Sequence, residues 1–297
     1  MLFTEKITNL QEWSEIFQNK AAFTPLAQEI FARCGLPFSG LESCAPGSNA
    51  VFGAGKYIVK IFSPVQAQLG GAEEFVAEKY GLERAARLGV PAPRVMASGV
   101  LEDRYVFRWM VLERVKGDLL AHAVPGLSDG DWFELGAQLR QAVERLDAPC
   151  ADFYGKALGN ADSEARWMLF SQAFRKERQT LLAGWQPQPV FVHGDLNADN
   201  LMVAKDGRLV LIDFADCRTA PFETELAALV CDGFRFPAAY LRGFLEEYDR
   251  AQMAKALLRG LLLHDYGAWI IRDQIGTPDT FQSLDALERS LLCCLNR

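Results

Sequence analysis

Two carboxylates and one amide lie close together in the segment 190–216, each near the end of a short apolar run. One apolar run leads to Asp195, and Asn200 comes five residues later. A polar turn then leads to a second run, Leu209–Ile212, which ends at Asp213. Carboxylate and amide oxygens are suitable ligands for Mg²⁺, and a positioned carboxylate can orient a hydroxyl toward a phosphate. The segment therefore predicts a hairpin that holds Mg²⁺ and supports phosphoryl transfer.

A lysine inside an apolar strand-like segment is the second feature that needs a chemical explanation. Lys60 lies in the aromatic and β-branched run Tyr57–Phe62, where a buried lysine without an anionic partner would be costly. The helix expected at about Ala72–Leu88 carries Glu78 on the same side as Phe75. We therefore expect Glu78 to pair with Lys60, with a solvent-facing lysine at a sheet edge as the alternative.

A glycine-rich segment at Gly53–Lys56 has the ending of a nucleotide-binding P-loop but lacks the rest of that pattern. A P-loop requires a glycine five residues before Gly55, where this chain has Ala50. It also requires a serine or threonine after the lysine, where this chain has Tyr57. The segment is therefore expected to be the turn of a β-hairpin.

Composition and charge limit the classes of protein to which the chain can belong. The 297 residues are half apolar and about a quarter charged, as in a globular protein with room for two lobes. The net charge of −7 arises entirely after residue 100, which disfavours nucleic-acid binding. That charge would suit a cationic substrate or would simply keep the protein soluble, and both interpretations stay open. The sequence shows no signal peptide, no membrane span and no C-x-x-C pair, so we expect a cytoplasmic protein.

The periodicity of apolar residues predicts a mixed region of helices and strands followed by a mainly helical region. The chain passes from apolar to polar to glycine between residues 111 and 117, which predicts a lobe boundary whose backbone could hydrogen-bond a flat nucleobase. Strands are expected at Arg94–Val100 and Arg104–Glu113. Helices are expected at about Leu10–Gln18, Pro25–Cys34, Ala72–Leu88, Asp129–Leu146, Ser163–Ala183, Glu223–Gly233, Ala238–Asp249, Ala251–Asp273 and Ser283–Leu295.

From about residue 41 to its end, the chain resembles the aminoglycoside phosphotransferase and choline kinase family. The resemblance rests on the motifs His193-Gly-Asp-Leu-x-x-x-Asn200 and Ile212-Asp-Phe214, together with Lys60 in a strand and Glu78 on the next helix. It implies an α+β, bilobal, protein-kinase-like fold, in which an N-terminal antiparallel sheet lobe with one key helix precedes a larger helical lobe. Together with the helices and the lobe boundary expected from the residue pattern, this gives an N-lobe at 1–112 with a helical extension at 1–36, a hinge at 113–117, and a C-lobe at 118–297 that contains the hairpin 190–216.

The resemblance also implies roles for the polar residues of the two motifs. Asp195 would be the catalytic base, which orients the acceptor hydroxyl and takes its proton. Asn200 and Asp213 would hold Mg²⁺ against the phosphates of ATP, although GTP is an equally compatible donor. Lys60 would bind the α- and β-phosphates and would itself be held by Glu78.

Further nucleotide contacts implied by the family come from backbone groups of the first lobe. The base would contact the backbone of Glu113 and Val115. His193 would support the hairpin through hydrogen bonds. The turn expected to cover the phosphates consists of Gly47, Ser48 and Asn49.

One departure from the family is that Glu225 stands where relatives often have an aspartate that braces the catalytic loop.

The phosphate acceptor is the least defined part of the prediction. The family implies a small molecule with a hydroxyl group, bound by the last helices, and an acidic pocket would favour an aminoglycoside or another cationic or sugar-like metabolite. A protein serine/threonine kinase is an alternative, but only a short segment separates Asp213 from Glu225. A second alternative is a nucleotide-binding pseudokinase, but the complete set of motif residues argues against it. The candidate acceptor residues are Asp232, His264, Asp265 and Trp269.

Overall fold

The computed structural model describes the whole chain except residues 46, 123–125, 151, 154, 160 and 297. It divides into two compact units, each of which is built from several segments of the chain. The first contains Met1–Arg87, Ala92–Lys116 and Asp213–Ala215. The second contains Leu88–Pro91, Gly117–Ile212 and Asp216–Arg297. Within the described residues no helix is long and apolar enough to cross a membrane.

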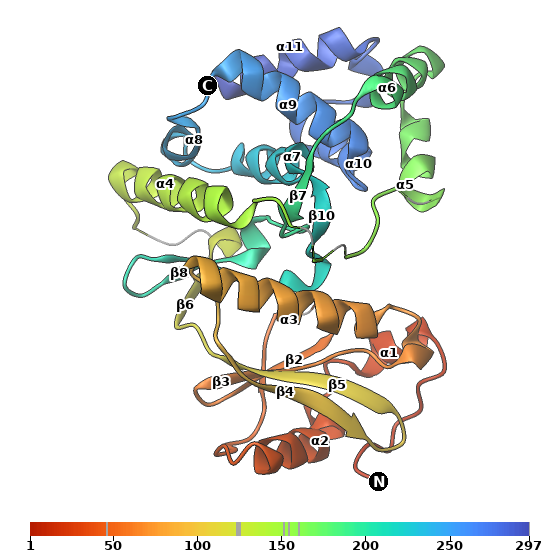
Figure 1. The fold of residues 1–297 in the computed structure, drawn as a ribbon, viewed down its shortest axis with the longest axis vertical. Coiled ribbons are helices and arrows are strands. Elements are labelled where there is room, and N and C mark those ends of the chain that lie inside the picture. Colours follow the sequence, from red (N-terminus) through yellow and green to blue (C-terminus); the bar gives the residue numbers. More distant parts are fainter. Residues whose placement is uncertain (46, 123–125, 151, 154, 160, 297) are drawn as a thin grey trace. The chain divides into compact units, whose positions relative to one another are not determined.

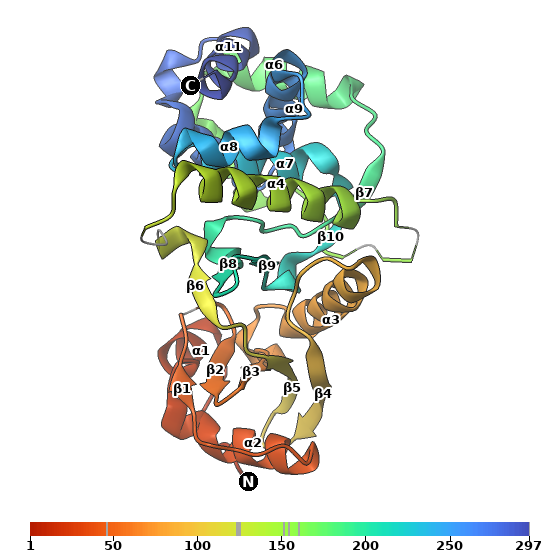
Figure 2. The ribbon, with the colours of Figure 1, turned by 90° about the vertical axis from the view of Figure 1, so that its left-hand side faces the viewer.

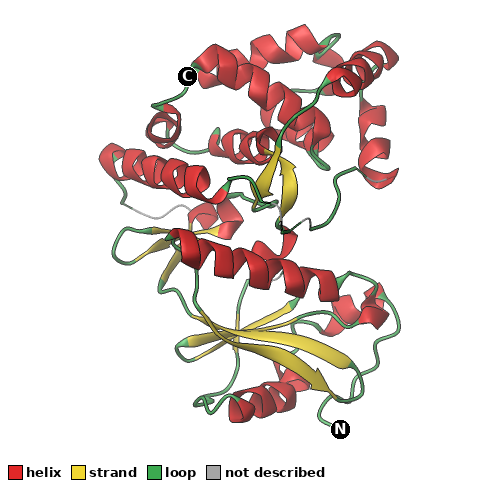
Figure 3. Ribbon diagram, in the orientation of Figure 1, coloured by secondary structure: helices red, strands yellow, loops and turns green. Residues whose placement is uncertain are grey.

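A five-stranded antiparallel sheet forms the centre of the first unit (Figures 1 and 3). The strand order is β1-β2-β3-β5-β4, so β3 lies in the middle of the sheet. The turn between β2 and β3 is the expected hairpin, and Gly55 takes a left-handed φ of 63° there. The strands are β1 Glu42–Ser43, β2 Ala50–Ala54, β3 Tyr57–Ile61, β4 Val95–Glu102 and β5 Val106–Glu113.

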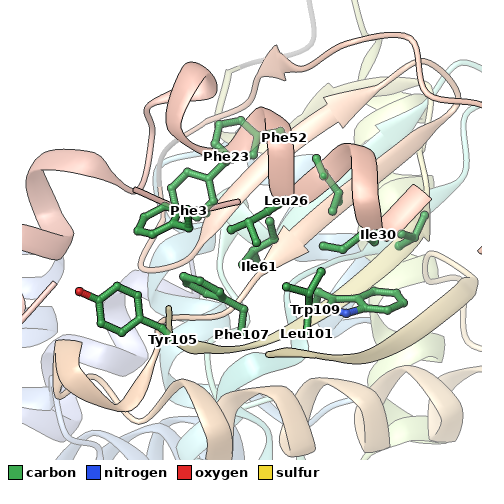
Figure 4. Packing of buried hydrophobic residues seen from close by; sticks show 14 of the residues in the cluster. Phe3, Phe23, Leu26, Ile30, Phe52, Ile61, Leu101, Tyr105, Phe107 and Trp109 are labelled. Carbon is green, nitrogen blue, oxygen red and sulfur yellow. The ribbon is translucent and has the colours of Figure 1, made fainter. Parts of the chain in front are cut away.

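Helix α2, Lys20–Arg33, covers one face of this sheet, and α3, Gly71–Leu88, lies on the opposite face (Figure 1). Aromatic side chains fill the space between α2 and the strands, where Phe23 packs against Phe52 and Phe107 (Figure 4). The short helix α1 spans Leu10–Ile16.

The start of α2 differs from the expectation that this helix begins at Pro25. The helix begins five residues earlier, at Lys20, because the side chain of Asn19 accepts hydrogen bonds from the N–H groups of Ala21 and Ala22. Pro25 lies inside the helix and does not end it.

The second unit consists mainly of helices, with two small sheets (Figures 2 and 3). Strands β6 Gly117–Leu119, β8 Leu201–Ala204 and β9 Leu209–Leu211 form one sheet. Strands β7 Pro189–Val192 and β10 Arg218–Pro221 pair antiparallel in the other. The helices are α4 Asp129–Leu146, α5 Ala161–Arg166, α6 Gln172–Gly184, α7 Phe222–Gly233, α8 Ala238–Leu245, α9 Arg250–Leu263, α10 Gly267–Ile270 and α11 Leu284–Leu295.

Two helices expected to be continuous are broken in the structure. The helix expected at Ser163–Ala183 is divided into α5 and α6, because Ser171 starts a new helix by capping the N–H of Phe174. The helix expected at Ala251–Asp273 ends at Leu263, and the extended backbone of His264 (ψ 138°) separates α9 from α10. This second break matters for the site, because it places His264 and Asp265 in a turn instead of on a helix face.

Candidate active site

An ion-pair cluster in the first unit joins Lys60, Glu78 and Asp213. Strand β3 carries Lys60, and α3 carries Glu78 on the face that points toward the sheet. The Nζ atom of Lys60 lies 2.5 Å from Oε2 of Glu78 and 2.7 Å from Oδ1 of Asp213. The expected pairing of Lys60 with Glu78 is therefore present, and the alternative of a solvent-facing lysine is wrong because Lys60 is 4% exposed.

Burial dominates the electrostatics of this cluster. Desolvation would lower the pKa of Lys60, but attraction to Asp213 and Glu78 outweighs it and holds the pKa above its ordinary value. Desolvation raises the pKa of Glu78 to about 7, although Lys60 opposes that shift. Lys60 is therefore a permanent cation, held in place by a carboxyl group whose ionised form is costly to bury.

The backbone around Asp213 has an unusual conformation. Asp213 takes a φ of 61°, a left-handed value that is uncommon for a residue with a side chain. The next residue, Phe214, is fully buried, and its ring lies so close to α3 that a Cβ on Gly81 would be 2.7 Å from it. Close packing of Phe214 on Gly81 thus fixes the turn that directs the Asp213 carboxylate toward Lys60.

In the second unit, strand β7 leads to the loop that carries Asp195. The amide nitrogen of Asn200 donates to Oδ2 of Asp195 at 2.7 Å and to its carbonyl at 2.8 Å. The amide nitrogen of Asn197 donates to Oδ1 of Asp195 at 3.0 Å. Both carboxylate oxygens of Asp195 thus accept hydrogen bonds from side-chain amides, which fixes the orientation of the carboxylate. Because its nitrogen is used on Asp195, Asn200 has its amide oxygen left for a hard cation such as Mg²⁺.

Three contacts fix the loop that carries Asp195. A ring nitrogen of His193, Nε2, lies 3.0 Å from the carbonyl oxygen of Ile212, so His193 supports the hairpin as expected. Gly194 has a φ of 86°, and a Cβ there would lie 2.1 Å from the carbonyl oxygen of Asp216. The N–H of Gly194 donates to Oε2 of Glu225 at 2.8 Å, so this glutamate braces the loop.

Glu225 gives a prediction for the pH dependence of stability. Burial raises its pKa to about 7, with the charge of Asp195 adding to the shift. Between about pH 4.5 and 7 the folded protein therefore keeps a proton that the unfolded chain has lost, and stability falls as the pH rises. We expect the wild type to lose about 2.5 kcal/mol of stability relative to Glu225→Gln between pH 5 and pH 8. Urea unfolding at several pH values measures this difference, and parallel curves for the two proteins would contradict it.

The residues expected to contact the nucleotide phosphates have structural partners. Asn49 is buried; its amide nitrogen donates to Glu74 at 2.7 Å, and its oxygen accepts from the N–H of Ser63 at 3.0 Å. The carbonyl of Ser48 accepts from the ring N–H of Trp13. These contacts hold the turn in shape, so phosphate binding by Gly47, Ser48 and Asn49 would depend on backbone N–H groups and stays a prediction.

The segment expected to contact the base is also anchored to its neighbours. The N–H of Glu113 donates to the carbonyl of Arg94 at 2.9 Å, and the two side chains form an ion pair at 2.8 Å. The N–H of Arg114 donates to the carbonyl of Lys56. Base recognition by the backbone of Glu113 and Val115 stays a prediction, and the N–H of Glu113 is already used within the unit.

A cavity of about 250 Å³ lies beside Asp195, entirely within the second unit. It brings Asp195 together with two of the candidate acceptor residues, His264 and Asp265. The break after α9 allows these two side chains to reach the cavity from a turn. Seven charged residues among those described line the cavity. The acidic ones are Asp195, Asp216, Glu225 and Asp265, and the basic ones are Lys156, Arg166 and Arg218.

The other two candidate acceptor residues do not line this cavity. Asp232 accepts a hydrogen bond from the N–H of Ala198 at 2.8 Å and pairs with Arg235 at 2.9 Å, so it supports the loop after Asp195. Trp269 stacks on Arg166, whose guanidinium carbon lies 4.5 Å from the ring centroid. A direct contact of either residue with the acceptor stays a prediction.

A sequence model described as "Phosphotransferase enzyme family" matches residues 49–259, which is more than half of the chain. The chain belongs to this family. A small-molecule kinase, as expected from the motifs, is thereby confirmed at the level of the family. None of the curated proteins compared with the chain matches it.

Solved structures with the same fold have low sequence identity to this phosphotransferase. The GDP complex of wild-type aminoglycoside 2'-phosphotransferase-IIIa has 17% identity and a TM-score of 0.57, with 92% of this chain and 99% of that chain covered. Aminoglycoside phosphotransferase APH(4)-Ia has 15% identity and a TM-score of 0.59, covering 90% and 98%. Choline kinase LicA from Streptococcus pneumoniae has 16% identity and a TM-score of 0.51, covering 91% and 99%. These likenesses confirm the expected α+β, protein-kinase-like fold class.

Two arginines of this phosphotransferase were not identified from the sequence. Arg218 is buried, and its guanidinium lies 3.3 Å from Oδ2 of Asp265 and 3.6 Å from Oδ1 of Asp216. Arg166 donates to the carbonyl of Asp265 at 2.7 Å. Arg218 is the first residue of β10, and nothing near it in the sequence points to its partner Asp265, 47 residues away.

Proposed function

We propose that this phosphotransferase moves the γ-phosphoryl group of ATP to a hydroxyl of a small molecule. Asp195 would be the base, and Asn200 and Asp213 would hold Mg²⁺. The observation that carries the proposal is the Asp195 carboxylate, which is held by two amide hydrogen bonds at the wall of a cavity. Solved structures of relatives contain the adenine nucleotides ADP and AMP-PNP. GTP is the alternative donor, since another relative was solved with GDP.

The chemistry requires alignment and charge neutralisation more than covalent participation of the protein. Asp195 would hold the acceptor hydroxyl by a hydrogen bond and receive its proton as the new oxygen–phosphorus bond forms and the bond to the β-phosphate breaks. Lys60 would bind phosphate oxygens, and Glu78 and Asp213 keep its ammonium group in one position. Mg²⁺, when bound, would neutralise the charge of the phosphates, and the oxygen donors of Asn200 and Asp213 suit it.

The acceptor proposed here is a small hydroxylated molecule. Relatives of the same fold act on aminoglycosides or choline by name, and their solved complexes contain hygromycin B or kanamycin. An aminoglycoside or another cationic or sugar-like metabolite is therefore one acceptor class to test. A protein acceptor is the alternative that the short segment between Asp213 and Glu225 disfavours.

Mass spectrometry of the reaction products tests this proposal directly. We expect the chain, incubated with ATP and Mg²⁺, to add one phosphate to at least one hydroxyl compound in a panel of sugars, polyols, hydroxy acids and aminoglycosides. A generic protein substrate should gain none. Phosphorylation of the protein substrate would favour a protein kinase. Absence of any turnover, with ATP still bound, would favour a pseudokinase.

A further inference from the structure

The charges that line the cavity beside Asp195 do not form an acidic site. Four carboxylates are opposed by three cations, and one of the carboxylates, Glu225, has its pKa raised to about 7 by burial. Arg218 is already paired with Asp216 and Asp265. Two of the four carboxylates are therefore already neutralised by Arg218, which disfavours a polycationic acceptor.

Arg166 is the distinctive feature of this cavity, because neutral groups hold it. Its guanidinium carbon lies 4.4 Å from the ring centroid of Tyr266 and 4.5 Å from that of Trp269, and the two rings contact each other with centroids 5.9 Å apart. One guanidinium nitrogen donates to the carbonyl oxygen of Asp265 at 2.7 Å. Among the described residues no carboxylate forms an ion pair with it, whereas Arg178 and Arg218 both have one. Arg166 is thus a positioned cation that lines the cavity and has no ion-pair partner in the described part of the chain.

His264 adds a hydrogen-bond donor to the same wall. Burial, together with the charge of Arg218, lowers the pKa of His264 to about 4, so the ring is neutral at pH 7. The N–H of Tyr266 donates to Nδ1 of His264 at 3.0 Å. In the neutral ring the proton must then be on Nε2, which can donate to a ligand oxygen.

The size of the cavity limits what it can enclose. Its volume of about 250 Å³ corresponds to roughly eight water molecules at about 30 Å³ each. Pockets for drug-sized ligands occupy about 300–1,000 Å³. The part of an acceptor that this cavity can enclose is therefore small.

We propose that the acceptor is a small hydroxyl compound carrying a carboxylate or phosphate group, and that Arg166 binds this anionic group. The proposal rests on the proposed function, because it assigns the substrate class of the same site. A guanidinium matches the two oxygens of either group in a bidentate contact. The rings of Tyr266 and Trp269 and the carbonyl oxygen of Asp265 hold the guanidinium of Arg166 in position before the acceptor arrives. This reduces the conformational entropy lost on binding.

Matched sets of acceptors test this inference. Glycerol, glycerate, glycerol phosphate and 3-amino-1,2-propanediol form one set, and glucose, gluconate, glucose 6-phosphate and glucosamine form another. We expect an anionic member of a set to be phosphorylated with at least about tenfold higher kcat/KM than its neutral member, and to raise Tm without ATP. The carboxylate and phosphate arms identify which anion is preferred.

The variant Arg166→Gln should raise KM for the anionic acceptor by about 10- to 100-fold, with a smaller change in kcat. Its KM for the neutral member should not change. Arg272→Gln is the matched control, because Arg272 also lies over the ring of Trp269 but pairs with Asp273 and does not line the cavity. The control should behave as the wild type with all acceptors.

The outcomes separate this inference from the proposed function. Preferred phosphorylation of an amine, unaffected by Arg166→Gln, would overturn the inference and keep the function. The inference would also fail if no anionic compound bound better than its neutral partner. An anion that binds through Arg166 but is never phosphorylated would uphold the anion-binding role of Arg166 and contradict the proposed phosphotransfer.

Discussion

Replacement of Asp195 by Asn is expected to lower kcat for acceptor phosphorylation by about 10²- to 10⁴-fold. The amide cannot take the proton of the hydroxyl, although it fills the same space. The carbonyl of residue 195 would still accept the hydrogen bond from Asn200, so the loop should keep its conformation. One of the two side-chain hydrogen bonds would face an NH₂ group instead of an oxygen, which should cost about 1 kcal/mol of stability.

The control for this change is Asp206→Asn in the turn of the same hairpin. Asp206 is exposed and pairs only with Arg208 among the described residues, so its loss should affect neither turnover nor stability measurably. Steady-state rates of ADP release with the best acceptor, together with thermal unfolding, measure both effects. A kcat for Asp195→Asn within threefold of the wild type would remove Asp195 from the role of base.

Replacement of Lys60 by Met is expected to destabilise the protein by about 3–5 kcal/mol at pH 8, because it leaves the Glu78 carboxylate buried without its cation. The loss should be smaller at pH 5. The pKa of Glu78 is already about 7 in the folded wild type, so at pH 5 the Glu78 carboxyl group is protonated and needs no cationic partner. Lys56→Met, at an exposed position in the neighbouring turn, is the matched control and should change stability by less than about 0.5 kcal/mol.

The double variant Lys60→Met with Glu78→Met separates stability from activity. Two apolar side chains of similar size should recover most of the lost stability, because no unpaired charge remains buried between β3 and α3. Phosphotransfer should stay lost, since nothing replaces the ammonium group at the phosphates. Urea unfolding and ADP release test the two halves of this statement. Recovery of activity in the double variant would show that Lys60 supports only the fold.

Features set by neighbouring residues in the chain were predictable from the sequence. The helix Asp129–Leu146 has the expected bounds, because Ser128 and Asp131 form a capping box at its start and its apolar residues repeat without a break. The ion pair of Lys60 and Glu78 was also predictable, since a lysine in a buried strand requires an acid nearby. The bounds of the two lobes and the hinge at 113–117 stay predictions, while the change from the first unit to the second falls between Lys116 and Gly117.

Features set by distant residues were not predictable in this way. The composition of the segment 251–273 is that of one apolar helix, and nothing local indicates that the helix ends at Leu263. The partners of Asp265 are Gly159 and Arg218, 106 and 47 residues away, so their pairing depends on the complete fold of the second unit. For the same reason the sequence does not predict the position of Arg166, which donates to the carbonyl oxygen of Asp265, 99 residues away.

The segment Asp213–Ala215 has a consequence for how the chain is made. It packs in the first unit, with Asp213 on Lys60 and Phe214 on Gly81, yet the chain on either side of it belongs to the second unit. During synthesis the first unit therefore lacks one of its pieces until residue 215 has left the ribosome. Until then Lys60 has only Glu78 as a partner, and α3 has no Phe214 to cover Gly81. The nascent first unit thus has to wait for the catalytic hairpin before its core is complete.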